Sequence, residues 1–222
     1  MPFAGHPTLG TAFVIRQNCT SPPPVVHLNL NLGCIPVRFE QPAGGPLLGE
    51  MTQVDPCFGQ LHDREDVARA TGLTVADLDP NLPIQTVSTG VPFVLVPLRS
   101  LAVAQALRFN WNNAAPYLEK SDGKFFYFVT RETIDPKCSL HARMIFYNGE
   151  DPATGSAAGC CAAWAVAHGV AQPDEVLWVE QGVEIQRRSH IRLRAGMQDG
   201  KVVNVRVGGS VVEVMRGVVT LP

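Results

Sequence analysis

Two short segments of the sequence share a pattern of residues that could bind an anion and move a proton. Residues 5–12 and residues 150–157 align without a gap, 145 positions apart. Each segment contains an ionisable residue followed by proline, two further residues, a glycine, a hydroxyl residue and an alanine. The ionisable residue is His6 in the first copy and Asp151 in the second. This self-similarity predicts two copies of one structural unit, related by pseudo-two-fold symmetry.

The chemistry of each copy follows from its residue types. Proline favours the first turn of a helix, and glycine lets the backbone approach a ligand closely. The N–H groups at a helix start, together with the positive end of the helix dipole, bind carboxylate or phosphate. Two such starts would form a cleft for a small anion, with His6 and Asp151 as an acid–base pair. The alternative is structural: Asp151 and Thr11 would cap helices, and His6 would be an ordinary turn residue.

The segment after the second copy is expected to position this chemistry. Residues 156–168 form a predicted helix that contains no Asp, Glu, Lys or Arg. A helix that is apolar all round must be buried all round, and its small residues allow surrounding backbone to pack closely. Cys160 and Cys161 are interpreted as small buried residues of this helix rather than as redox or metal-binding groups. The sequence therefore predicts an α+β fold with a curved sheet around a central helix.

The remaining elements are predicted from apolar periodicity and capping residues. Helices are expected at residues 9–17, 63–70, 74–78, 100–107 and 113–119. Strands are expected at residues 25–32, 34–40, 50–54, 84–88, 93–98, 125–130, 142–147, 176–180, 191–195, 202–207, 211–215 and 218–221. The last strands do not alternate with helices, so a Rossmann-type sheet is not expected. Two prolines between residues 79 and 83 predict a division into lobes 1–82 and 83–222, the last strands packing back on the first lobe.

Composition excludes several classes of function. The 222 residues include 18 basic and 20 acidic side chains, a balance that argues against a nucleic-acid partner. No apolar run approaches the ~20 residues of a membrane span. The first residues lack a basic stretch followed by an apolar core, so a cytoplasmic protein is expected. The cysteines form no Cys-x-x-Cys pair and the histidines show no ligand spacing, so neither a disulfide framework nor a metal site is expected.

Four segments together resemble the signatures of the PhzF-like phenazine-biosynthesis family: residues 3–12, 88–92, 150–157 and 180–184. The resemblance extends over the whole chain. It implies the diaminopimelate-epimerase-like fold, in which two pseudo-symmetric lobes, each a curved mixed sheet around a central helix, enclose the site in a cleft. It also implies an isomerase that needs no metal or organic cofactor. The best-known activity of the family moves a proton between ring carbons of a dihydro-hydroxyanthranilate.

The same resemblance assigns roles to individual residues. His6 and Asp151 would be the catalytic residues at the reacting ring of a small carboxylate-bearing substrate. The substrate-binding residues would be Gly5, Thr154, Gly155 and Ser156. In epimerases of this fold that use two cysteines, the thiols would stand at the positions of Ala4 and Asp151, so a two-thiol racemase is not expected.

The two copies differ in the length of chain that precedes them. If the second lobe begins at Ile84, 67 residues of that lobe precede Asp151, whereas five precede His6. Symmetry therefore predicts that roughly 62 residues are absent from an incomplete N-terminal lobe, which would expose a sheet edge and one side of the helix after His6. In the family this segment carries a glutamate proposed to transfer the proton, and no residue here matches it. Three explanations remain open: a truncated enzyme, a short homologue completed as a homodimer, and a non-catalytic anion-binding or interaction protein.

Overall fold

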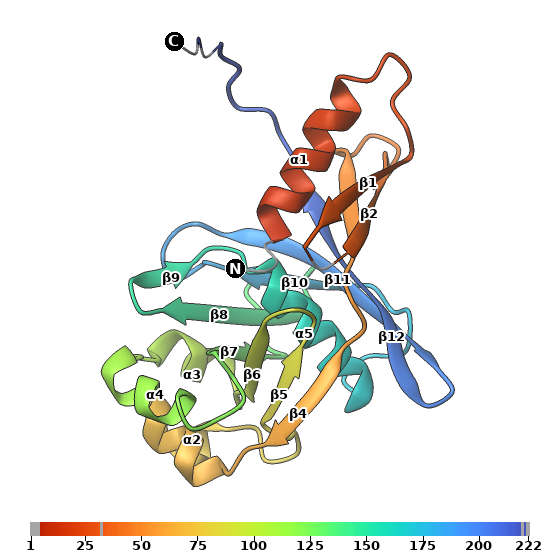
Figure 1. Cartoon of the computed structure of the whole chain (residues 1–222). Helices are drawn as coiled ribbons and strands as arrows, with labels where there is room; N and C mark the ends of the chain where they lie inside the picture. The colour runs from red at the N-terminus through yellow and green to blue at the C-terminus, as the bar shows by residue number, and fades with distance from the viewer. Residues whose placement is uncertain (1–4, 32, 219, 221–222) are drawn as a thin grey trace.

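The computed structural model describes residues 5–31, 33–218 and 220 (Figure 1). The helices are α1 Gly5–Gln17, α2 Arg64–Thr71, the 3-10 helix η1 Val75–Asp77, α3 Leu101–Ala106, α4 Trp111–Leu118 and α5 Gly155–Ala167. The strands are β1 Val25–Leu30, β2 Gly33–Glu40, β3 Leu48–Thr52, β4 Cys57–Leu61, β5 Gln85–Ser88, β6 Pro92–Pro97, β7 Phe125–Thr130, β8 Leu140–Phe146, β9 Gly149–Asp151, β10 Leu177–Gln181, β11 Ser189–Gln198 and β12 Lys201–Ser210. The predicted α+β class is confirmed. Across the described ranges, no helix has the length and apolar character that crossing a bilayer requires.

Strands from both halves of the chain join one continuous sheet. The order is β1-β2-β3-β12-β11-β10-β8-β7-β6-β5-β4, and β9 pairs with β8 beside this path. The β10–β8 and β6–β7 pairs are parallel. Strand β12 pairs with β3 from Arg206↔Thr52 to Ser210↔Leu48. The last strand in the sequence therefore lies beside one of the first strands. The division at residue 82 stays a prediction; β4, which that division places in the first lobe, pairs with β5.

Helix α5 lies at the centre of the main core (Figure 1). Its buried residues run without interruption from Ser156 to Val166, and β5, β6, β11 and β12 pack around it. Small side chains make this possible: a Cβ on Gly159 would lie 1.9 Å from Oε1 of Gln53. Trp164 is the large exception, and its buried indole donates to the carbonyl oxygen of Pro83 at 3.2 Å.

A second apolar core lies on the other face of β6 and β7, under α2, α3 and α4. Successive residues of these strands point to opposite faces. Phe93 and Tyr127 therefore contact the core around α5, whereas Val94 and Phe126 contact the second core. Burial on both faces explains why residues 125–130 are apolar almost without interruption.

The first helix is only partly covered. Phe13 is buried, but Val14 is 54% exposed and Ile15 is 42% exposed. Helix α1 packs on β1 and β3, and β1 forms one end of the sheet (Figure 1). The helix begins at Gly5 rather than at residue 9, so the first copy of the motif is helical whereas most of the second copy precedes its helix.

Other differences from the predicted elements have physical reasons. The sequence does not predict β4 or β9, because neither strand alternates apolar and polar residues. The strands predicted at residues 211–215 and 218–221 are wrong over residues 211–218 and 220, which have no regular structure; residues 219 and 221 lie outside the described residues. Val214 and Met215 are 93% and 88% exposed, since β12 already pairs with β11 and β3 and offers these residues no neighbouring strand.

Candidate active site

The starts of α1 and α5 meet where the two copies of the motif lie. A Cβ on Gly5 would lie 3.2 Å from Gly155 Cα, and a Cβ on Gly155 would lie 3.5 Å from Gly5 Cα. Glycine at both positions therefore allows the two backbones to approach each other closely. The positive ends of two helix dipoles converge on this region, which favours a negatively charged ligand.

A cavity of about 400 Å³ opens beside the two helix starts. Its lining includes all six of the predicted site residues, Gly5, His6, Asp151, Thr154, Gly155 and Ser156. His6 is exposed and Asp151 is half-buried, so a small molecule in the cavity can reach both side chains. Their catalytic and binding roles stay predictions.

A second cavity of about 400 Å³ shares part of this lining, including Gly5 and His6. The second cavity adds Arg188, Ser189 and His190, at and just before the start of β11. The sequence does not predict these three as site residues, because only the pairing of the sheet brings β11 beside the motif.

A buried glutamine holds the loop that carries Asp151. The Nε2 atom of Gln181 donates to the Asp151 carbonyl oxygen at 2.8 Å and to Thr154 Oγ1 at 2.9 Å. Its Oε1 atom accepts from the Thr154 N–H at 3.2 Å and from the Tyr127 hydroxyl at 3.1 Å. The motif at residues 180–184 is the sequence signal for Gln181, but only the structure shows that it positions Asp151.

Thr154 is the N-cap of α5, yet its side chain makes no capping hydrogen bond. Its hydroxyl instead donates to Asp151 Oδ2 at 2.8 Å. Within the described residues, the first N–H groups of α5 therefore have no side-chain cap, which suits them to bind an anion. Thr11 lies inside α1 and not at its start. Neither Asp151 nor Thr11 is therefore the cap of a helix, contrary to the structural alternative.

An ion pair anchors β9, the short strand that ends at Asp151. Arg143 on β8 donates to both carboxylate oxygens of Glu150, at 2.9 and 2.7 Å, and both side chains are 8% exposed. Arg143 also donates to the carbonyl oxygens of Ala104 and Leu107, at the C-terminal end of α3. Because the partners are bidentate and buried, the pair holds β9 in one position.

A buried histidine beside this ion pair contacts two carboxylates. His141 Nδ1 lies 2.9 Å from Glu180 Oε1, and Nε2 lies 3.0 Å from Glu184 Oε1 in an ion-pair contact that is not an aligned hydrogen bond. Burial opposes the charged imidazole, but Glu184 and Glu180 outweigh it and raise the pKa of His141 above 6.5. Burial also opposes the charged carboxylates, yet backbone N–H groups and His141 hold the pKa values of Glu180 and Glu184 below 4.5.

We expect this network to stabilise the protein most between about pH 4.5 and 6.5. The contribution of His141 is complete below pH 6.5 and is lost as pH rises through its raised pKa; the contribution of the two carboxylates is lost as pH falls through their lowered pKa values. Urea unfolding across pH measures both limbs. His141→Gln should flatten the alkaline limb, and His27→Gln, at an exposed position, should not. An alkaline limb that His141→Gln leaves intact would contradict this assignment.

The cysteines of α5 are unsuited to catalysis. Burial raises the pKa of Cys160 to about 11 and that of Cys161 to about 12. Because the thiolate is the reactive form of cysteine, both groups are inert at neutral pH. Of the two positions expected to carry thiols in a two-cysteine racemase, Asp151 lies at the cavity, and Ala4 lies outside the described residues.

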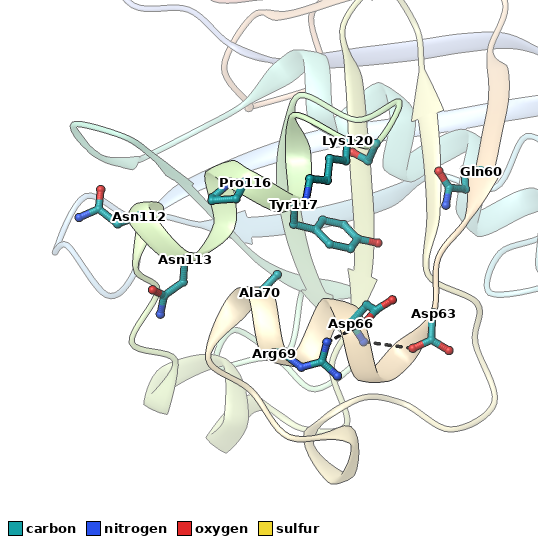
Figure 2. Close-up of a pocket in the computed structure, with 11 residues that line it drawn as sticks. Gln60, Asp63, Asp66, Arg69, Ala70, Asn112, Asn113, Pro116, Tyr117 and Lys120 are labelled. Atoms are coloured by element: carbon teal, nitrogen blue, oxygen red, sulfur yellow. Dashed lines mark hydrogen bonds and ion pairs between the residues drawn. The ribbon is translucent and has the colours of Figure 1, made fainter.

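A larger cavity, of about 780 Å³, lies away from the motifs, between α2, α4 and the end of β4 (Figure 2). Its lining contains none of the predicted site residues. Asp63 and Asp66 contribute carboxylates, and Arg69 is paired with Asp66 at 2.9 Å. Burial, and then nearby carboxylates, raise the pKa of Tyr117 to about 12. Lys120 is the other cation of the lining, and the start of α2 at this cavity is already capped by Asp63, unlike the start of α5 at the motif.

Known proteins resemble the chain over nearly its whole length. A family model described as phenazine biosynthesis-like protein matches residues 1–217. An uncharacterized isomerase of Mesorhizobium japonicum is 34% identical over 230 residues, which cover 98% of this chain and 75% of that protein. A trans-2,3-dihydro-3-hydroxyanthranilate isomerase of Pseudomonas chlororaphis is 29% identical, with coverage of 100% of this chain and 76% of that protein.

Solved structures share the fold. A PhzF-family protein of Bacillus anthracis has a TM-score of 0.80 and 26% identity, covering 95% of this chain and 73% of that one. A predicted epimerase of Pseudomonas aeruginosa has a TM-score of 0.78 and 31% identity, covering 95% and 72%. A probable proline racemase of Agrobacterium radiobacter, with a TM-score of 0.58 and 14% identity over 96% and 68% of the two chains, shares the fold alone. The fold is the predicted diaminopimelate-epimerase-like fold, and the chain belongs to the phenazine biosynthesis-like PhzC-PhzF family.

Proposed function

We propose that this protein is a cofactor-independent isomerase that shifts a proton within a small carboxylate-bearing substrate, such as a dihydro-hydroxyanthranilate. The observation that carries the proposal is the meeting of two helix starts at one cavity lined by both His6 and Asp151. The isomerase names of relatives that match almost the whole chain support the reaction class.

The geometry supports a division of work between binding and chemistry. The substrate carboxylate would lie against the uncapped N–H groups of α5 and the Ser156 hydroxyl, where Gly5 and Gly155 leave the backbone open. His6 and Asp151 would act as the acid–base pair: one group takes a proton from a ring carbon and the other delivers a proton to a second ring carbon. The double bond moves between the two carbons, and the composition of the substrate is unchanged.

Incubation in heavy water tests this proposal. A panel of cyclic carboxylates that includes a dihydro-hydroxyanthranilate should yield a shifted isomer, or carry deuterium at carbon, because the proton passes through side chains that exchange with solvent. Nuclear magnetic resonance detects both results. If no member of the panel is isomerised or labelled, the proposed isomerase activity is wrong.

A non-catalytic anion-binding or interaction protein of the same fold is the alternative. The uncapped helix start supports anion binding whether or not a reaction follows. This alternative predicts that the panel binds at the cavity without isomerisation or labelling. A homodimer and a cytoplasmic location also stay predictions, which a solution mass measurement and cell fractionation would test.

A further inference from the structure

Three side chains with metal-binding groups lie together beside the second cavity. Asp135, Cys138 and His190 each offer one ligand atom, and these atoms all lie within 4.8 Å of one another. Carboxylate, thiolate and imidazole are the side-chain ligands that zinc uses in proteins. Asp135 Oδ2 lies 3.3 Å from His190 Nε2. That separation fits an oxygen and a nitrogen bound to one tetrahedral zinc ion, which the bond lengths place about 3.3 Å apart.

A tight turn brings the first two of these side chains together. The Cys138 N–H donates to the Asp135 carbonyl oxygen at 2.9 Å, and Pro136 occupies the turn position that proline favours. The Lys137 N–H donates to Asp135 Oδ1 at 3.0 Å. Because Oδ1 is engaged in this way, Oδ2 is the oxygen that lies near His190.

The pairing of β10 with β11 places the third side chain. His190 lies opposite Glu180 in this strand pair. The Glu180 carboxylate is fully buried and accepts from the Ile134 N–H at 2.7 Å and from the Asp135 N–H at 2.9 Å. Glu180 therefore ties the turn to the strand pair, as residues behind a metal site commonly orient the ligands.

The charges around the cluster favour a cation. Burial, followed by Glu180 and Asp135, raises the pKa of Cys138 to about 11, against the lowering effect of Arg188. A divalent cation would supply the positive charge that a thiolate requires there.

We propose that Asp135, Cys138 and His190 form a binding site for a divalent ion of the zinc type. The Cys138 thiol releases its proton to solvent as the sulfur, one oxygen of Asp135 and a ring nitrogen of His190 bond to the ion. Three protein ligands leave a further position for water or a ligand group. His190 also lines the second cavity, as His6 does, so the ion would lie at the rim of that cavity.

This proposal does not depend on the proposed isomerisation. Its three ligands do not include His6 or Asp151, and its test measures metal binding rather than turnover. The protein, freed of metal with a chelator, is titrated with zinc against a chromophoric competitor. We expect a single zinc ion to bind, and Asp135→Asn, Cys138→Ser and His190→Gln each to weaken binding by at least about tenfold. Cys57→Ser and His27→Gln, which change an exposed thiol and an exposed imidazole outside the cluster, should leave the affinity unchanged.

Cobalt provides a measurement on the unmodified protein. Bound cobalt should show a thiolate-to-metal charge-transfer band in the near ultraviolet, which Cys138→Ser abolishes and Cys57→Ser retains. The proposal is overturned if zinc does not bind, if bound cobalt shows no thiolate band, or if the three cluster variants bind zinc as tightly as the control variants. Far-ultraviolet circular dichroism establishes that each variant is folded.

Discussion

The Asp151→Asn variant should bind the substrate carboxylate but lose at least about 100-fold in turnover, because general acid–base catalysis contributes typically about 10²–10⁴-fold. Asparagine has the shape of aspartate but cannot accept and release the proton. Its carbonyl oxygen can still accept from the Thr154 hydroxyl, which now lies 2.8 Å from Asp151 Oδ2. The Gln181 bond to the Asp151 carbonyl oxygen involves only backbone at this position and remains.

Two measurements separate catalysis from binding in this variant. Calorimetry should show little change in affinity for the carboxylate ligand, and isomer formation should collapse. Asp199→Asn is the matched control, since Asp199 is exposed in the turn between β11 and β12, at a positive φ of 51° that asparagine also adopts. If Asp151→Asn isomerises substrate as fast as Asp199→Asn, Asp151 is not a catalytic residue. If the unmodified protein binds ligands but isomerises none, the non-catalytic alternative holds.

Gly182→Ala should strongly destabilise the protein and displace the loop before α5. Gly182 has a φ of +77°, and a Cβ there would lie 2.5 Å from the Arg187 carbonyl oxygen and 2.8 Å from Pro152 Cα. Both clashes are with backbone, so a side-chain rotation cannot relieve them. Pro152 directly follows Asp151, which lines the cavity, so displacement of Pro152 should change the position of the Asp151 carboxylate. Isomerase activity should therefore fall together with stability.

A control variant at a second glycine separates the energetic cost of this clash from the cost of a positive φ. Gly169, after α5, has a φ of +69° and no heavy atom within 4 Å of a Cβ. Gly169→Ala should lower the free energy of unfolding by roughly 1–2 kcal/mol, the ordinary cost of a left-handed conformation. Gly182→Ala should lose that amount and roughly 1–3 kcal/mol more through overpacking. Urea unfolding measures the difference, and equal losses at the two positions would show that the contact with Pro152 carries no strain.

Local signals predict the helices that carry their own start and stop. Helix α2 follows Asp63, whose carboxylate accepts from the N–H groups of Glu65 and Asp66, and ends at Gly72 with a φ of 75°. Both signals are visible in the sequence because a cap and a left-handed stop depend on adjacent residues. Helix α5 is predicted for a different reason: its segment contains no charged residue and no polar stripe, so a helix there must be buried on all sides.

The strands are predicted less well because their partners are distant. Strand β4 has no apolar alternation, and its pairing with β5 depends on residues 85–88. The segment at residues 211–218 has the β-branched and apolar residues of a strand, but it pairs with none of the strands in the described residues. Alternation records which faces of a strand could be buried, and not whether an edge is available for hydrogen bonding.

The sequence by itself determines the two motif copies, and so the types of side chain offered to a ligand: His6, Asp151, and the glycines and hydroxyls around them. Those assignments depend on neighbours within a few residues, which sequence spacing records. Only the tertiary structure decides that the two helix starts lie in close contact at Gly5 and Gly155. The same is true of the hydrogen bond from Gln181 to the backbone of Asp151. The cluster formed by Asp135, Cys138 and His190 is likewise invisible to ligand spacing, because Cys138 and His190 are 52 positions apart. They are brought together through Glu180, which lies opposite His190 and accepts from the Asp135 N–H. Contacts across a sheet are selected by burial and hydrogen bonding along the whole strand, and no short stretch of sequence contains that information.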